Sequence, residues 1–177
     1  MTPAEFTQKW KRSPIVKFTL SSPLSSGLSE CSVSTLKNFG LPQSAEPWLS
    51  FMEFVMTDSF PAADLNERDL FPIGSLANGS FICIEKSSDR VVIFDRDDPE
   101  ELWVLNRSLQ SLYDSIDIFD TFIAEVNRRN PAFSWDFRIP DGMLDELRQK
   151  LTGCDPESME AKGYWYCELG VLDDSAV

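Results

Sequence analysis

The chain has 177 residues, 42% of them hydrophobic and 25% charged, a composition that is typical of one folded globular domain and excludes a disordered chain. Its 16 basic against 29 acidic residues give a formal net charge of −13, which disfavours nucleic acid and membranes as partners and favours a basic protein. The acidity lies after residue 40, because residues 1–40 hold five basic and two acidic residues whereas the remainder holds 11 and 27.

A short helix is predicted at the N-terminus. Thr2 and Glu5 stand three residues apart, with proline at the first helical position between them, which is the pattern of a capping box. We expect this helix to run to about Lys11 and to bury Phe6 and Trp10.

A strand, a loop and a second helix are predicted next. Apolar and polar residues alternate over 15–20, which indicates a strand, and the serine-rich segment 21–29 is typical of an exposed loop. Either Ser32 or Ser34 can cap a following helix that stops at Gly40, where a left-handed residue is expected.

The middle of the chain predicts an antiparallel sheet. Short apolar runs bounded by turn residues occupy 70–74, 81–85, 91–95 and 102–105. A polar loop of about five residues, 86–90, joins two of them as a hairpin. We expect Gly74 and Gly79 to serve a turn that needs a positive φ. The earlier run 48–56 fits the period of a strand and of a helix about equally, and we favour a strand.

A long amphipathic helix follows this sheet. Apolar residues recur at every third or fourth position from Leu109 to Val126, which predicts one buried face, and either Asn106 or Ser108 can cap the helix. The opposite face carries Asp114, Asp117, Asp120 and Glu125. We interpret these carboxylates as the solvated stripe of a surface helix.

The last third predicts one helix and one strand. Pro140 and Asp141 open an amphipathic helix that runs through Leu151 and ends at Gly153. The aromatic run 163–169 is expected to form a final strand whose rings are mostly core, with one ring possible as a contact site.

Catalytic chemistry finds little support in the sequence. The chain has no histidine, which removes the commonest general base and the commonest zinc ligand. The four cysteines lie far apart without a CxxC pair, so we interpret them as reduced thiols in a cytoplasmic protein. No basic and apolar leader and no run of about 18 apolar residues occurs. We therefore expect no enzyme activity, no metal and no cofactor.

The densest acidic cluster lies between the third and fourth strands of the predicted sheet. Its carboxylates belong to Asp95, Asp97, Asp98, Glu100 and Glu101. A solvated connection between strands, a partner-binding surface, and weak metal binding or catalysis all remain open for this cluster. The spacing of its oxygen ligands does not match a calcium-binding EF-hand loop. We take these five residues as the candidate contacts for a partner.

One series of motifs suggests a family. A helix ending in Gly40-Leu41-Pro42 precedes Ile73-Gly74, Gly79 and the strand 81–84, and then come Val91-Val92 with Asp95, Asn106-Arg107-Ser108-Leu109, Phe119 and Phe122. This order resembles the SUKH superfamily, the fold of many bacterial immunity proteins and of a yeast cell-wall synthesis regulator, and most of all its fourth immunity family. The resemblance covers about residues 33–126 best. The chain departs from the pattern in the hairpin loop, where Ser88-Asp89 replaces a glycine.

The resemblance implies an α+β fold, a single domain over residues 1–177, in which helices flank a central, mostly antiparallel sheet. It also implies binding and neutralisation of a cognate toxin, often a nuclease or a nucleic-acid deaminase, with no catalytic residue to carry over. We therefore expect a monomeric immunity protein that captures a basic toxin. The alternatives are a regulatory scaffold that binds several host proteins, and a carboxylate-dependent enzyme that uses Asp95, Asp97 or Asp98.

Overall fold

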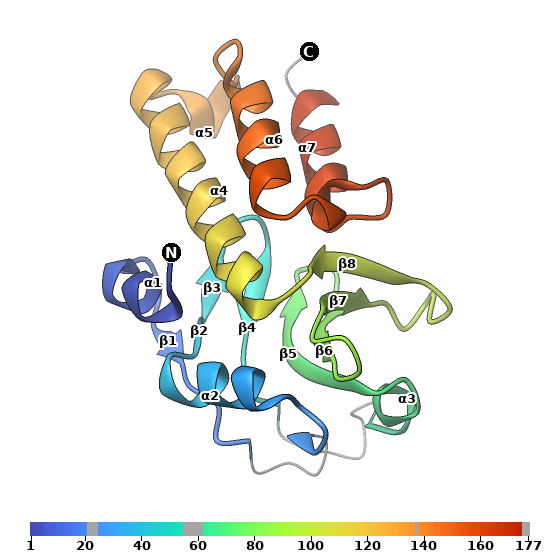
Figure 1. Ribbon diagram of the computed structural model, residues 1–177. Coiled ribbons are helices and arrows are strands. Elements are labelled where there is room, and N and C mark those ends of the chain that lie inside the picture. The colour runs from blue at the N-terminus through green and yellow to red at the C-terminus, as the bar shows by residue number, and fades with distance from the viewer. Residues whose placement is uncertain (21–24, 55–61, 137, 175–177) are drawn as a thin grey trace.

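A six-stranded antiparallel sheet with helices around it forms the computed structural model, which describes residues 1–20, 25–54, 62–136 and 138–174 (Figure 1). The sheet has the order β3 (Ser44–Ala45), β4 (Leu49–Phe51), β5 (Leu70–Leu76), β6 (Phe81–Glu85), β7 (Val91–Phe94) and β8 (Leu102–Asn106). A second, two-stranded sheet pairs β1 (Ile15–Val16) with β2 (Leu41–Pro42). The predicted α+β class with a central antiparallel sheet is confirmed.

The helices lie on several sides of this sheet. They are α1 (Pro3–Lys9), α2 (Glu30–Asn38), α3 (Ala62–Glu67), α4 (Leu109–Arg129), α5 (Phe133–Asp136), α6 (Met143–Cys154), a 3-10 turn η2 (Glu157–Met159) and α7 (Tyr164–Asp174). In Figure 1, α4, α6 and α7 stand together above the sheet, whereas α2 and α3 lie below it. Within the described ranges, no helix combines the length and the apolarity that crossing a membrane needs.

The long helix α4 forms as its sequence predicts. Ser108 caps it, and the side chain of Ser111 returns a hydrogen bond to the backbone of the cap. Nine of its residues are buried, at the spacing of one helical face. Asn106, the other candidate cap, is instead fully buried. Its amide nitrogen donates to Ser115 at 3.0 Å and to Asp155 at 2.9 Å, so this side chain joins separate elements. Its amide oxygen accepts the indole N–H of Trp165 at 3.2 Å.

The first helix is also confirmed, with the capping box of Thr2 and Glu5 in place. The helix ends at Lys9, and both predicted aromatic residues are buried. Phe6 stacks on Trp10 with 5.2 Å between ring centroids and lies 4.9 Å from the ring of Tyr113 on α4. These rings join the N-terminal helix to the main core.

The second helix begins earlier than predicted. Ser29 is its cap, because the Ser29 hydroxyl accepts the backbone N–H of Ser32 at 3.0 Å. Ser32 therefore lies inside the helix, where its hydroxyl donates to Asp89 at 3.0 Å. Gly40 has the expected left-handed conformation at φ +72, and a Cβ there would lie 2.2 Å from the carbonyl oxygen of Val16. Residues 21–24 of the predicted loop lie outside the described residues.

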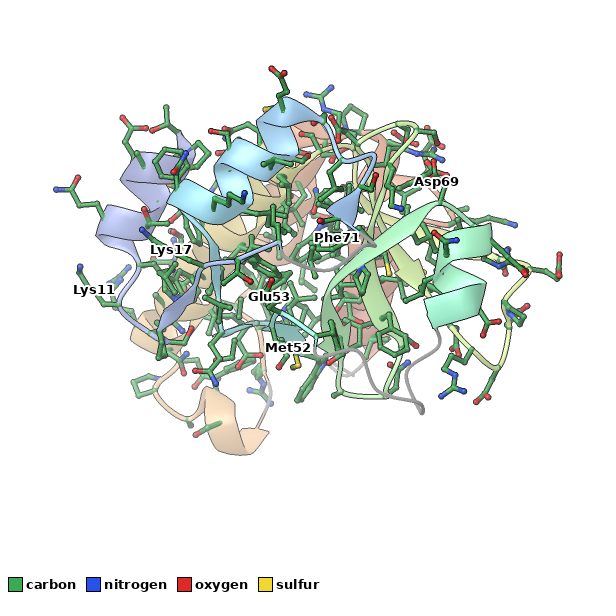
Figure 2. All side chains as sticks on the ribbon, turned by 90° about the horizontal axis from the view of Figure 1, so that it is seen from below. Lys11, Lys17, Met52, Glu53, Asp69 and Phe71 are labelled. Atoms are coloured by element: carbon green, nitrogen blue, oxygen red, sulfur yellow. The ribbon has the colours of Figure 1, made fainter. Side chains whose placement is uncertain are left out.

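The strand predicted over 15–20 is shorter than expected. Its pairing stops at Val16, because the backbone N–H groups of Thr19 and Leu20 donate to the Glu53 carboxylate at 3.0 and 2.8 Å. Figure 2 shows Glu53 in the middle of the molecule, with Lys11 and Lys17 on the α1 side and Asp69 on the α3 side. The strand favoured for 48–56 is present over 49–51, and residues 55–56 lie outside the described residues.

The hairpin of β6 and β7 matches the prediction, with the loop 86–90 between them. Asp89 occupies the position of the missing glycine and has the left-handed φ of +59. Only one of the two predicted turn glycines serves a turn, since Gly79 has φ +92 whereas Gly74 lies inside β5. Gly74 is required there by close packing, because a Cβ would lie 2.2 Å from the backbone oxygen of Ser50.

The predicted final strand is wrong, because the chain from Tyr164 to Asp174 is the helix α7. Trp165 and Leu169, four residues apart, are buried against the core, as one helical face requires. Tyr166 points away, with 52% of its surface exposed. The aromatic run resembled a strand locally, yet among the described residues it forms one β-bridge with the sheet, the parallel bridge of Gly163 to Val104. The helix α6 also passes the predicted stop at Gly153 and ends at Cys154.

Candidate interaction surface

The acidic loop of residues 95–101 connects β7 to β8, and its two end residues are engaged within the chain. The Asp95 carboxylate accepts the backbone N–H of Asp97 at 2.9 Å and the hydroxyl of Ser80 at 3.3 Å. Glu101 is half-buried and forms an ion pair with Lys162. These two carboxylates therefore shape the loop and hold it against its neighbours.

The three carboxylates between them face solvent. Asp97, Asp98 and Glu100 are exposed, and the Glu100 side chain retains 90% of its surface. Its contact with Arg68 at 3.5 Å is loose. Across the described ranges, no lysine or arginine forms an ion pair with Asp97 or Asp98. The loop thus presents negative charge that the chain itself leaves largely unneutralised.

Among the described residues, no group of three or more histidine, cysteine, aspartate or glutamate side chains is arranged to hold a metal ion. The predicted role of the loop in partner binding stays a prediction.

A second acidic group, the stripe of Asp114, Asp117 and Asp120 on α4, is not the solvated face that the sequence suggested. The N-terminal ammonium lies 2.9 Å from Asp114, Lys9 lies 2.5 Å from Asp117, and Arg12 lies 2.5 Å from Asp120. Burial raises the pKa of Asp120, and the positive charge of Arg12 opposes that rise. Two basic side chains of the N-terminal segment and its ammonium group therefore pair with α4.

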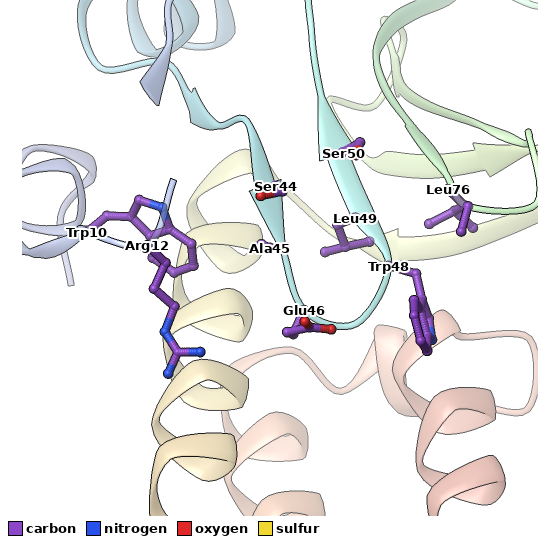
Figure 3. A pocket seen from close by; sticks show the side chains of 10 residues that line it. Trp10, Arg12, Ser44, Ala45, Glu46, Trp48, Leu49, Ser50 and Leu76 are labelled. Carbon is purple, nitrogen blue, oxygen red and sulfur yellow. The ribbon is translucent and has the colours of Figure 1, made fainter. Parts of the chain in front are cut away.

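The tip of the β3–β4 hairpin carries the most exposed aromatic side chain among those whose burial the structure describes. Trp48 retains 66% of its surface and has a φ of +60, which is strained for a bulky residue. A hollow of about 440 Å³ lies on one side of it, between the hairpin and the N-terminal segment (Figure 3). We call this the α1 hollow; it is lined by Trp10, Arg12, Ser44, Ala45, Glu46, Trp48, Leu49, Ser50, Leu76 and Ala77.

A second hollow of about 410 Å³ also borders Trp48. We call it the α7 hollow, because its wall includes the first turns of that helix; it is lined by Trp48, Leu76, Ala77, Asn78, Tyr164 and Glu168. Burial raises the pKa of Glu168. No described lysine or arginine pairs with the Glu168 carboxylate.

The hairpin tip is held firmly on both sides of Trp48. The hydroxyl of Tyr164 donates to the carbonyl oxygen of Pro47 at 2.6 Å. On the other side, Leu49 is 1% exposed and pairs with Leu76 across β4 and β5. The backbone that carries the indole is therefore fixed before any partner arrives.

These features lie at one end of the sheet. The strand register pairs Leu49 with Leu76 and pairs Ser75, the neighbour of Leu76, with Phe81. Phe81 in turn pairs with Phe94, and Phe94 pairs with Leu102. The hairpin tip, the β5–β6 turn and the acidic loop leave the sheet from this row, and the start of α7 lies against it through the Val104–Gly163 bridge and the Lys162–Glu101 ion pair. We call this surface the loop end.

Sequence reasoning found the acidic half of the loop end and missed the aromatic half. Trp48 was included in an apolar run, although it directly follows a proline between two short strands, which is the local signal of a turn. Among the residues of the final aromatic run, Tyr166 is exposed as one ring was expected to be, but it lines neither hollow.

Comparison with known proteins gives one match. Residues 26–173 match the model of the SUKH-4 immunity protein family. No curated protein and no solved structure matches the chain. The match begins after α1 and β1, so these two elements lie outside the matched part.

Proposed function

Because the chain belongs to the SUKH-4 immunity protein family, we propose that it binds a protein toxin and neutralises it by covering the toxin's active site. The family match over residues 26–173 carries this proposal. It favours neutralisation of a toxin over the alternative of a regulatory scaffold, since the family is one of immunity proteins.

The charge of the chain supports a basic toxin. A net charge of −13 attracts cationic surfaces at long range, and enzymes that act on nucleic acid need such surfaces to hold phosphates. We therefore propose a nuclease or a nucleic-acid deaminase as the toxin. The chain itself would catalyse no reaction in this role, and its lack of histidine is consistent with that.

The loop end supports a contact surface of the right chemistry. Asp97, Asp98 and Glu100 present negative charge there that an incoming basic surface can pair with. Such exposed charges mainly accelerate encounter, whereas tight binding comes from groups that are buried in the complex.

Co-expression tests the proposal. The chain is produced with the toxin that is encoded beside its gene, and we expect a 1:1 complex by light scattering and survival of the toxin-producing cells. The association rate of the complex should fall as salt is added, because exposed charges are screened. Absence of both a complex and protection overturns the proposal, and capture of several host proteins without protection supports the scaffold instead.

A further inference from the structure

We propose that Trp48 is the anchor of the toxin complex, and that the α7 hollow receives an arginine side chain of the toxin, which stacks on the indole and pairs with Glu168. This inference rests on the proposed function for the identity of the partner as a toxin. It goes beyond that function by naming the contact and the chemistry of the group that fills it.

The exposure and the rigidity of Trp48 are the first support. Tryptophan is the residue most enriched in interface hot spots, and 66% of this one lies open to solvent on a tip that neighbouring residues fix. A side chain that is ordered before binding loses little conformational entropy when the partner arrives. The backbone of Trp48 has a positive φ of +60, which is strained for a bulky residue. Strained residues of this kind cluster at binding and active sites.

The charges decide between the two hollows. Arg12 and Glu46 both line the α1 hollow, so its wall carries charges of both signs. Figure 3 shows the Arg12 and Trp48 side chains on opposite sides of Glu46. The α7 hollow is lined by Glu168 and by no lysine or arginine, so it is the hollow that fits a cationic group.

The state of Glu168 is the third support. Its carboxylate is half-buried, and burial raises its pKa, so the charged form is poorly stabilised within the chain. An incoming cation stabilises that charge. Arginine fits better than lysine, because its planar guanidinium stacks on an indole face and bonds a carboxylate with the same group.

Another hollow, of about 440 Å³, carries charges of both signs, with more cations than anions. It lies between α4 and α6, and Arg128, Arg129 and Lys150 line it together with Glu125 and Glu146. A basic toxin surface is not attracted to that wall. The α7 hollow adjoins the acidic loop instead, since the β5–β6 turn lines the hollow through Asn78 and bonds Asp95 through Ser80.

Replacement of Trp48 by glycine tests the anchor without endangering the fold. Glycine accepts a φ of +60 without strain, so W48G should unfold at the wild-type temperature or above it. Its affinity for the co-encoded toxin should fall about 30-fold or more, the loss that marks a hot spot. The matched control Y166A removes the other exposed ring, 52% open and outside both hollows, and should bind within about twofold of wild type.

A titration without toxin tests the arginine site itself. The probe is N-acetyl-arginine methylamide, followed by the indole N–H resonance of Trp48, which is identified by its loss in W48G. We expect a saturable shift, a weaker one for the lysine analogue, and a severalfold lower affinity in E168Q. The arginine site is overturned if the Trp48 resonance does not respond or if E168Q responds like wild type.

The two proposals fail in different ways. Wild-type chain that binds the toxin while W48G binds it equally well overturns the anchor and leaves the proposed function standing. Wild-type chain that neither binds nor neutralises the toxin overturns the proposed function, whatever the titration with the arginine probe gives.

Discussion

The stripe of Asp114, Asp117 and Asp120 on α4 and the loop carboxylates of Asp97 and Asp98 look alike in the sequence, since both are acidic residues on polar segments. The structure treats them differently. Each carboxylate of the stripe is paired with a cation from residues 1–12, whereas no described cation pairs with the two loop residues. Lys9, Arg12 and the N-terminal ammonium hold the first group within the fold, and the second group stays open to solvent. A surface charge count alone cannot make this distinction.

The largest expected effect is a loss of stability, and it tests whether the N-terminal helix α1 is part of the folded core. F6A should lower the free energy of unfolding by about 3–5 kcal/mol, because Phe6 is 1% exposed and packs on two aromatic rings. Urea denaturation measures it. A loss under about 1 kcal/mol would mean that α1 rests on α4 without contributing to stability.

A third kind of carboxylate is buried in the core and is held by hydrogen-bond donors of the chain itself. Asp155 is 0% exposed, and one of its oxygens accepts the Asn106 amide and the backbone N–H of Arg107 at 2.9 and 2.7 Å. D155A should lower the free energy of unfolding by about 2–3 kcal/mol, since it orphans buried donors. The same denaturation experiment decides it, and W48G is the control that should show no loss.

Neutralising the stripe should affect stability and spare recognition. The triple variant D114N, D117N and D120N is expected to lower the free energy of unfolding by about 1–2 kcal/mol, a small sum because the partly exposed pairs are screened by solvent. Its association rate with the toxin should match wild type. A slower association would show that the stripe also faces the partner.

Neutralising the loop should do the reverse. The triple variant D97N, D98N and E100Q keeps the structural carboxylates of Asp95 and Glu101 and should leave thermal unfolding unchanged. At low salt, association with a basic toxin should slow about tenfold, and the difference should vanish at high salt. Stopped-flow mixing measures both rates. Equal rates at low salt would remove the loop from the contact surface.

The smallest effect is a dependence of stability on pH. Burial raises the pKa of Glu168, so the folded state holds this proton more tightly than the unfolded state does. Stability from this group is present below the unfolded pKa of about 4.3 and is lost as pH rises through the higher folded pKa. E168Q should remove that loss, so its stability relative to wild type should rise from acid to neutral pH. Denaturation curves at several pH values detect it, and a flat difference would contradict the assignment.

The sequence by itself determined the elements whose signals are local. The capping box of Thr2 and Glu5, the period of α4, the β6–β7 hairpin and the left-handed Gly40 all depend on residues within a few positions of one another. Caps, periods and turns act at that range, and the family resemblance rests on their order along the chain.

Tertiary structure decided the features that join distant parts of the chain. The aromatic run after Gly163 became α7, because burying Trp165 beside Asn106 required a helical face rather than a strand at the sheet edge. The stripe on α4 is paired with an N-terminal segment that lies more than 100 residues earlier in the chain. Trp48 stays exposed at the hairpin tip, because the residues on both sides of it are held in place. Leu49 pairs with β5, and the Pro47 carbonyl accepts the Tyr164 hydroxyl. A local sequence pattern does not indicate which distant surfaces come into contact. Burial and pairing between distant segments are therefore decided only by the tertiary structure.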